Sequence, residues 1–230
     1  MKSGRLLRPS GVVAYGDAYR WMHDLAEQRA AEEIPDTLLL LEHPPVYTAG
    51  RRSDPSHLVW TRSQMEAMGA ELHEVDRGGS VTFHGPGQLV GYPIVNLGTK
   101  PDVIGYLRKL EEVVMRASRD AGVELHRDPE ATGVWSGDRK VCAIGVRVTR
   151  GRITLHGFAL NCDVDRSWFD AIVPCGLADR GVATLTELAG REITVEEMWP
   201  LVVRHFEDVF ETRLVGGRTQ PLGERAAVRA

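Results

Sequence analysis

The stretch from Arg77 to Pro93 constrains the fold of this chain more than any other part of it. It packs five glycines and two prolines around an arginine and a histidine. Glycine adopts backbone conformations that other residues avoid, and it lets the main chain lie close to a ligand or to a second strand. The stretch therefore predicts two short strands joined by a bend, with a binding site beside them.

Size and charge limit the class of protein. A chain of 230 residues lies at the upper end of one α/β domain and can bury a core without disulfides or metals. We expect residues 1–230 to form one catalytic domain with a loose tail from about 216. Because 28 basic residues face 32 acidic ones and no long basic run occurs, a nucleic-acid-binding function is disfavoured.

The cysteines and the apolar runs indicate where in the cell the protein is located. Cys142, Cys162 and Cys175 are odd in number and form no C-x-x-C pair, so free thiols in a reducing compartment are expected. The longest apolar run, residues 37–41, is too short to span a bilayer, and no secretory signal follows Lys2 and Arg5. These features predict a cytoplasmic protein that does not enter a membrane.

Hydrophobic periodicity predicts a mixed α/β (α+β) fold. Helical spacing runs from Asp17 to Glu33, from Asp102 to Gly122 and from Thr194 to about Thr212, where Pro200 introduces a kink. Ser63–Glu66 has the capping-box pattern of a further short helix. The predicted strands cover residues 38–41, 71–75, 80–84, 89–95, 140–148 and 152–161, of which the last two form a hairpin.

Cys175 is the best candidate for a nucleophile. It lies between Pro174 and Gly176, a setting that can project a sulfur atom from a bend. Cys142 and Cys162 lie in or beside predicted strands, where a cysteine is more often a small buried hydrophobe. From these residues alone, Cys175 is as compatible with a structural role as with a reactive one.

A reactive thiol needs a neighbouring cation that favours the thiolate. Lys140, His84 and His156 are the candidates. Lys140 stands out because the chain has only three other lysines and otherwise prefers arginine. Its position at the start of a strand predicts partial burial, which favours proton transfer, although from the residues alone an ordinary surface cation at a strand end is the default. A structural role is the default for His156.

Several other kinds of site are disfavoured. His126-Arg127-Asp128 lacks the rest of a kinase catalytic loop, and the chain has neither a Gly-Lys-Ser/Thr phosphate loop nor a His-Glu-x-x-His zinc helix. We therefore expect no metal site.

Five segments in order resemble the lipoyl(octanoyl) transferase family. The resemblance runs from about Thr37 to Leu185, and Cys142 is the one local feature that does not carry over from the family. The segments that carry it are Glu42–Arg51, Arg77–Pro93, Lys140–Gly145, His156–Asn161 and Pro174–Gly176.

The resemblance implies a fold, an activity and a set of site residues. The fold would be that of lipoate ligases and of the catalytic domain of biotin ligases. The activity would be transfer of an octanoyl or lipoyl group through a thioester on Cys175, with Lys140 as its proton-transfer partner and His156 in support. The residues that would line the acyl site are Arg77, Gly78, Gly79, Ser80, Val81, Thr82, Phe83, His84, Ala143, Ile144, Gly145, Gly157, Phe158 and Ala159.

The resemblance also implies partners, and two rivals stay open. The donor would be acyl carrier protein, the acceptors the lipoyl domains of 2-oxoacid dehydrogenases and the glycine cleavage H protein, and no cofactor would be needed. One rival is an ATP-dependent lipoate or biotin ligase, although lipoate ligases follow the histidine with Asp where this chain has Gly85. The other is a non-catalytic module that binds acylated proteins.

Docking of acidic partners requires a local basic surface, because the chain as a whole carries a formal charge of −4. We expect contributions from five arginines, although solvated loops fit the pattern equally well. They are Arg51, Arg52, Arg147, Arg150 and Arg152.

Overall fold

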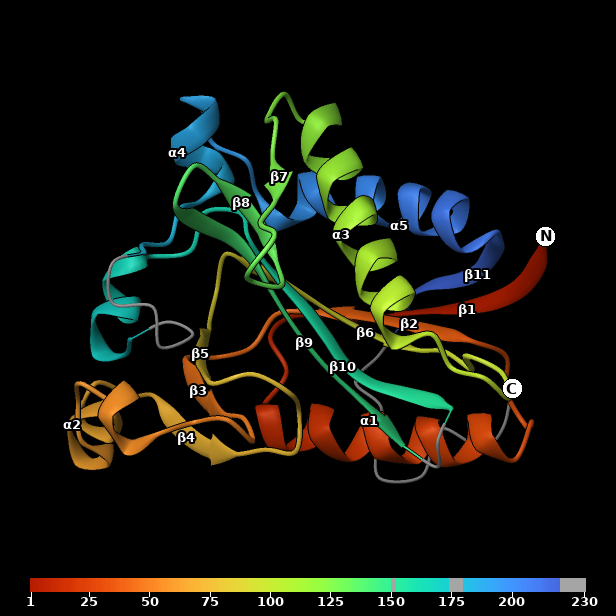
Figure 1. Cartoon of the computed structure of the whole chain (residues 1–230), viewed down its shortest axis with the longest axis horizontal. Helices are drawn as coiled ribbons and strands as arrows, with labels where there is room; N and C mark the ends of the chain where they lie inside the picture. Colours follow the sequence, from red (N-terminus) through yellow and green to blue (C-terminus); the bar gives the residue numbers. More distant parts are fainter. Residues whose placement is uncertain (150–151, 174–179, 220–230) are drawn as a thin grey trace.

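An eight-stranded mixed sheet forms the centre of the molecule (Figure 1). The structure is a computed structural model that describes residues 1–149, 152–173 and 180–219. The strand order is β11-β1-β2-β6-β10-β9-β8-β7, with β1 parallel to both of its neighbours and the other pairs antiparallel. The strands are β1 (Lys2–Pro9), β2 (Thr37–Leu41), β6 (Gln88–Ile94), β7 (His126–Arg127), β8 (Val134–Ser136), β9 (Arg139–Thr149), β10 (Ile153–Asn161) and β11 (Thr212–Thr219).

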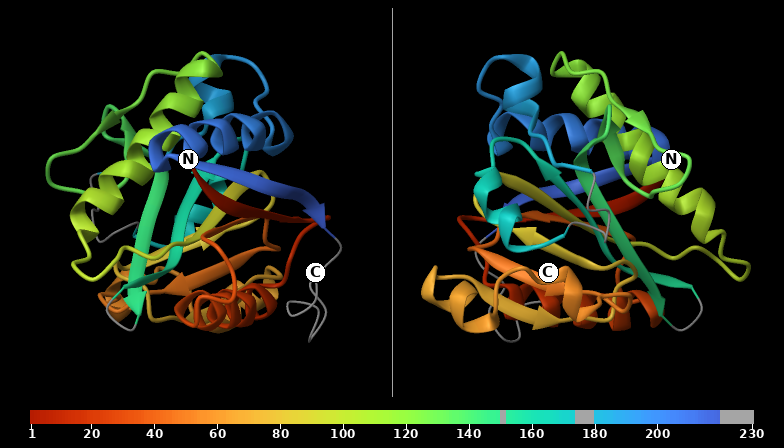
Figure 2. Two further views of the ribbon diagram at one scale, coloured as in Figure 1. Left: turned by 90° about the vertical axis from the view of Figure 1, so that its right-hand side faces the viewer. Right: turned by 60° about the vertical axis from the view of Figure 1, so that its left-hand side comes forward.

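Helices cover both faces of this sheet (Figure 2). Helices α3 (Val103–Asp120) and α5 (Val195–Phe210) pack on one face, and α1 (Tyr15–Ala30) packs on the other. Because both faces of the sheet are covered, the central strand β2 is uniformly apolar from Leu38 to Leu41. Its alternate residues Leu38 and Leu40 belong to the core under α3 and α5, whereas Leu39 and Leu41 belong to the core over α1.

A small second sheet stands beside the large one and has the order β4-β3-β5. Phe83 of this sheet stacks on Trp168 with ring centroids 5.2 Å apart and anchors a third apolar cluster. The elements of this region are β3 (Val46–Ala49), β4 (Glu71–Glu74), β5 (Val81–His84), α2 (Arg62–Ala67) and the 3₁₀ turns η1 (Pro55–His57) and η2 (Arg166–Ala171). Helix α4 (Leu185–Ala189) precedes α5.

Most of the predicted elements are confirmed. Asp102 caps α3 by accepting a hydrogen bond from the Gly105 amide at 2.8 Å, and Gly122 after the helix has a φ of 89°. Strands β9 and β10 form the predicted antiparallel hairpin. Helix α5 runs through Pro200, and Thr194 is its N-cap.

Two predictions are wrong in detail. The short helix α2 is capped by Thr61 and Gln64, two residues before the predicted capping box. Residues 216–219, assigned to a loose tail, continue β11 and pair in parallel with β1 up to Thr219 opposite Pro9. Periodicity missed this strand because two glycines interrupt its apolar pattern, whereas main-chain hydrogen bonding to β1 does not depend on side chains.

The helices of the described ranges give no membrane signal: none is both long enough and apolar enough to span a bilayer.

Candidate active site

A cavity of about 410 Å³ opens between the glycine-rich stretch, the β9–β10 hairpin and the loop before β8. All but one of the substrate-site residues expected from the sequence line it, and so do Lys140 and His156. The exception is Phe83, whose ring lies in the third apolar cluster. The remaining lining residues are Tyr15, Arg52, His57, Tyr92, Glu130, Ala131, Thr132 and Arg180.

Hydrogen bonds join the glycine-rich stretch to the loop that follows β3. The amides of Gly50, Arg51 and Arg52 donate to the carbonyls of Ser80, Arg77 and Gly79 at 3.0–3.2 Å. A Cβ atom on Gly50 would lie 2.5 Å from the Gly79 carbonyl oxygen, so only glycine permits this approach. The two glycine-containing loops seen in the sequence therefore form one wall of the cavity.

Arg77 holds this wall from inside. Its guanidinium is buried and donates to the Ser80 carbonyl at 2.8 Å, to the Thr48 carbonyl at 2.6 Å and to Thr48 Oγ1 at 2.9 Å. The Gly78 amide is also engaged, because it donates to the Val146 carbonyl of β9 at 3.0 Å. Arg77 and Gly78 thus shape the wall as well as line it.

The β9–β10 hairpin forms a second wall, which adjoins the first. A Cβ atom on Gly157 would lie 2.2 Å from the Gly91 carbonyl oxygen of β6, so glycine is required for this strand contact. Ile144 and Phe158 supply apolar surface to the cavity. His156 has a φ of 58° within β10, which is a strained conformation for a residue with a side chain.

Lys140 is buried at the end of the cavity nearest β8. The residue is only 6% exposed, so it is more deeply buried than the sequence suggested, and its ammonium nitrogen lies 4.6 Å from the centroid of the Trp135 ring. The Lys140 amide donates to the Gly181 carbonyl at 2.9 Å, and its carbonyl accepts from the Ala183 amide at 3.0 Å. Main-chain bonds on both sides thus fix the base of the side chain.

Cys175 lies outside the described residues. The nearest described residues on either side of it are Val173 and Arg180, and of these two only Arg180 lines the cavity. The Val173 amide donates to the carbonyl of His57, a lining residue, at 2.9 Å, and Arg180 is itself a lining residue. Arg180 also pairs with Asp128 at 2.6 Å, which ties it to the loop before β8.

Polar groups form the floor of the cavity, a feature that sequence reasoning missed. Tyr92 donates from its hydroxyl to His43 Nε2 at 2.8 Å, because His43 Nδ1 must donate to the Val13 carbonyl at 2.6 Å. The Tyr15 ring stacks on the His84 ring. Tyr15 lies at the start of α1, where nothing in the local pattern separates it from core aromatics.

Burial holds three histidines in their neutral form. It lowers the pKa of His43 to about 4 and that of His156 to about 3, in the latter with repulsion from Arg77. Burial and the neighbouring His43 hold the pKa of His84 well below its usual value. His156 Nε2 lies 2.7 Å from Asp76, but this carboxylate also pairs with Arg147, whose charge further lowers the pKa of His156. Burial likewise raises the pKa of the Cys142 and Cys162 thiols and leaves them unreactive.

These pKa shifts predict acid sensitivity of the fold. A histidine with a depressed folded pKa binds a proton more readily when unfolded, so stability is complete above about pH 6.5 and falls as the pH is lowered towards 4. We expect the free energy of unfolding to fall by up to about 4 kcal/mol per pH unit in this window. Urea denaturation at several pH values measures it.

A histidine substitution isolates the effect. His43→Gln should reduce the pH slope by about 1.4 kcal/mol per pH unit, because one proton-binding group is removed. His126→Gln, at an exposed position, serves as the control and should leave the slope unchanged. A flat stability profile between pH 6.5 and 4 would contradict the assignment of neutral histidines.

No group of three or more His, Cys, Asp or Glu side chains within residues 1–149, 152–173 and 180–219 is arranged to hold a metal ion.

The architecture is that of lipoate and biotin ligases. A lipoate-protein ligase A bound with ATP superposes with a TM-score of 0.76 at 17% identity, covering 95% of this chain and 90% of that one. A putative lipoate protein ligase from T. acidophilum with bound lipoic acid gives 0.75 at 17% identity over 95% and 89% of the two chains. At these identities the likeness defines the fold class.

Sequence similarity defines the family. The model of the lipoyl protein ligase A/B catalytic domain matches residues 14–207. The octanoyltransferase of Rubrobacter xylanophilus is 49% identical over 203 residues, which cover 88% of this chain and 91% of the relative. That of Acidothermus cellulolyticus is 49% identical over 198 residues, covering 84% and 86%. The chain belongs to the octanoyltransferases of the lipoyl protein ligase A/B catalytic domain family.

Proposed function

We propose that this enzyme moves an octanoyl group from acyl carrier protein to a lysine of lipoyl-dependent proteins through a thioester on Cys175. The identity of 49% to octanoyltransferases over most of the chain is the observation that supports acyl transfer most strongly. The roles of individual residues are part of the proposal. They are supported by the chemistry of the cavity.

The first half-reaction would load the enzyme. The Lys140 amine accepts the proton of the Cys175 thiol, and the thiolate attacks the thioester carbonyl carbon of the octanoyl carrier protein. The carbon–sulfur bond to phosphopantetheine then breaks, and the leaving thiolate takes the proton back from Lys140. The supporting observation is that Lys140 and Arg180 line one cavity and that Val173 donates to His57, another lining residue.

The second half-reaction would unload the enzyme. The amine of the acceptor lysine attacks the octanoyl–Cys175 carbonyl, a carbon–nitrogen bond forms, and the Cys175 thiolate leaves. Lys140 accepts the proton of the attacking amine and returns one to the thiolate. Exchange between thioesters is nearly balanced in energy and amide formation from a thioester is downhill, so we propose that neither ATP nor another cofactor is required.

The cavity suits an apolar chain with a reactive end. Its apolar lining includes Val81, Ala143, Ile144, Phe158 and Ala159, and its glycines leave room along the walls. The same lining includes Lys140 and Tyr92, and Tyr92 is bonded to the buried His43. We assign the apolar lining to the octanoyl chain and propose that His156 supports the site through its contact with Asp76.

The proposed partners are acyl carrier protein and, as acceptors, the lipoyl domains of 2-oxoacid dehydrogenases and the glycine cleavage H protein. A cytoplasmic location would give access to all of them. The rival ligase would consume ATP and free octanoate, and a binding module would form no covalent intermediate. Incubation with octanoyl carrier protein followed by intact-mass measurement tests the proposal, which requires a gain of one octanoyl group without ATP.

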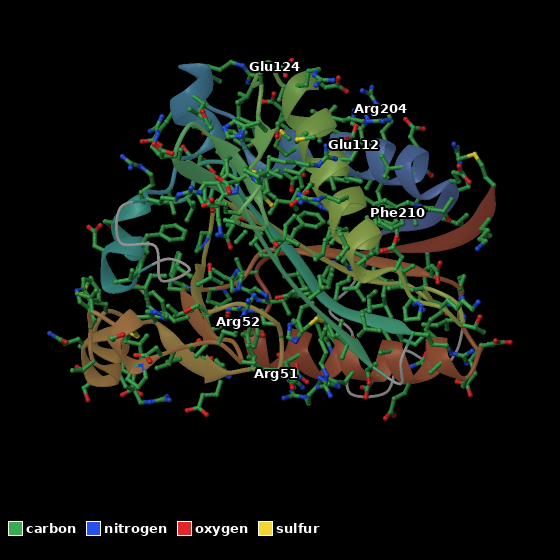
Figure 3. The ribbon with its side chains drawn as sticks, viewed as in Figure 1. Arg51, Arg52, Glu112, Glu124, Arg204 and Phe210 are labelled. Carbon is green, nitrogen blue, oxygen red and sulfur yellow. The ribbon has the colours of Figure 1, made fainter. Side chains whose placement is uncertain are left out.

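We restrict the proposed docking surface to two of the five arginines expected from the sequence. Arg51 and Arg52 are exposed beside the cavity, whereas the guanidinium of Arg147 pairs with Asp76 and Arg152 donates to the Ala30 carbonyl at 3.4 Å. Arg150 lies outside the described residues. Figure 3 shows Arg51 and Arg52 on the side of the sheet where α1 lies and Arg204 on α5, on the other side.

Charge reversal tests this surface. Arg51→Glu with Arg52→Glu should raise the KM for acyl carrier protein about tenfold at low salt and progressively less as salt is added, because screening weakens steering between exposed charges. Arg204→Glu with Arg213→Glu makes the same change in net charge on α5 and β11, at residues that do not line the cavity, and should leave KM unchanged. Steady-state kinetics from 20 to 500 mM salt, roughly the range over which the Debye length shrinks several-fold, provides the comparison. Identical salt profiles for the two double variants would rule out the docking role.

A further inference from the structure

A chain of buried polar side chains runs behind the cavity wall. His84 Nδ1 lies 2.8 Å from Gln88 Oε1, and Gln88 Nε2 donates to Asn161 Oδ1 at 2.9 Å. Asn161 Nδ2 in turn donates to the Ala183 carbonyl at 3.1 Å. Gln88 and Asn161 are 1% and 4% exposed, and neither lines the cavity. Any effect they have on the reaction must therefore pass through their neighbours.

Two main-chain carbonyls fix the direction of every bond in this chain. Gln88 Nε2 also donates to the Phe83 carbonyl at 3.2 Å, and Asn161 Nδ2 faces the Ala183 carbonyl. Because a carbonyl only accepts, both of these atoms must be amide nitrogens. Gln88 Oε1 then faces His84, whose Nδ1 must carry the proton. No flip of either amide can satisfy the same partners.

This series of hydrogen bonds ends at Ala183, whose main chain is bonded to that of Lys140. The Ala183 amide donates to the Lys140 carbonyl at 3.0 Å, and the Lys140 amide donates to the Gly181 carbonyl at 2.9 Å. Residues 181–183 directly follow Arg180, a described neighbour of the segment with Cys175. Gln88 and Asn161 therefore connect His84, in one wall of the cavity, to the main-chain hydrogen bonds between Lys140 and residues 181–183.

We propose that Gln88 and Asn161 are positioning residues that set the separation between the acyl-site wall at His84 and the Lys140 amine. The inference rests on the proposed function, since only there does Lys140 exchange protons with a thiol. A shift of about 1 Å in a reacting group can cost about a hundredfold in rate. Fully satisfied buried hydrogen bonds resist such a shift, because breaking one leaves an unpaired polar group.

Asn161→Ala, Gln88→Ala and the double variant test the proposal. We expect acyl-enzyme formation to slow by about 10- to 100-fold with an unchanged KM for octanoyl carrier protein, because no substrate contact is removed. The double variant should lose no more than the worse single variant, since either change breaks the same link. Rapid-quench intact-mass measurement gives the rates.

The pH midpoint of Cys175 alkylation is a second measurement, and a change in stability alone would not shift it. Iodoacetamide should label only this thiol in the folded enzyme, because Cys142 and Cys162 are fully buried. The pH midpoint of labelling should rise towards about 8.5 in the variants as Lys140 moves away from the thiol. Thr154→Val is the control: Thr154 is buried in the same strand β10, donates to the Pro93 carbonyl at 2.7 Å and does not line the cavity. It should keep the wild-type midpoint and rate.

Asn161→Asp keeps the proposal testable if the alanine variants fail to fold. The introduced carboxyl still accepts from Gln88, but it donates to the Ala183 carbonyl only when protonated. The ratio of its rate to that of the wild type should therefore rise as the pH is lowered from 8 to 6, roughly the range in which a buried carboxyl titrates.

The outcomes separate this inference from the proposed function. Wild-type rates and labelling midpoints in folded Asn161→Ala, additive losses in the double variant, or an equal midpoint shift in Thr154→Val would each overturn the positioning role. If the wild-type enzyme itself gains no octanoyl group, the proposed function fails first.

Discussion

Cys175→Ser is expected to lower the rate of octanoyl transfer by about a thousandfold or more and to leave no acyl-enzyme detectable by intact mass. A serine hydroxyl is a much weaker acid than a thiol, so the Lys140 amine cannot ionise it to a useful extent. The measurement is single-turnover transfer from octanoyl carrier protein to a lipoyl domain, with the mass of the enzyme followed in parallel.

The other two thiols supply matched controls. Cys142 and Cys162 are fully buried, and burial raises the pKa of both. Cys142→Ala and Cys162→Ala should therefore cost about 1 kcal/mol of stability each and leave the transfer rate unchanged. A normal rate in Cys175→Ser, or an octanoyl group retained on that variant, would place the nucleophile elsewhere.

The walls of the site could be predicted from the sequence, because glycines mark places where one main-chain segment lies close to another. Gly50 and Gly157 each face a carbonyl oxygen that a Cβ atom would overlap. Such contacts leave a direct trace in the sequence. The long amphipathic helix after Asp102 was predictable for a similar reason, since its cap and its periodicity are local.

The floor of the site could not be predicted in the same way. Tyr15 reaches the cavity from α1, and His43 and Tyr92 meet through the pairing of β2 with β6. Their roles depend on contacts between distant segments, which have no local signature. The strand at 212–219 was missed for the same reason, because it is stabilised by its pairing with β1 at the other end of the chain.

Lys140 substitutions should separate two roles that the proposed mechanism assigns to one amine. Lys140→Met keeps the length of the side chain near Trp135 but removes the charge and the proton. Lys140→Arg keeps a cation that can favour the thiolate, but arginine does not release its proton in proteins. Both should slow octanoyl transfer by about 10²- to 10⁴-fold, the usual contribution of general acid–base catalysis.

Labelling of Cys175 distinguishes the two variants. Thiolate formation needs only a nearby cation, so iodoacetamide should still label Lys140→Arg at neutral pH and should label Lys140→Met only at higher pH. The main-chain bonds of Lys140 to Gly181 and Ala183 do not involve its side chain, so both variants should keep the local fold. Transfer at the wild-type rate in Lys140→Met would remove Lys140 from the mechanism. Equal labelling of both variants at neutral pH would leave it a proton carrier that does not stabilise the thiolate.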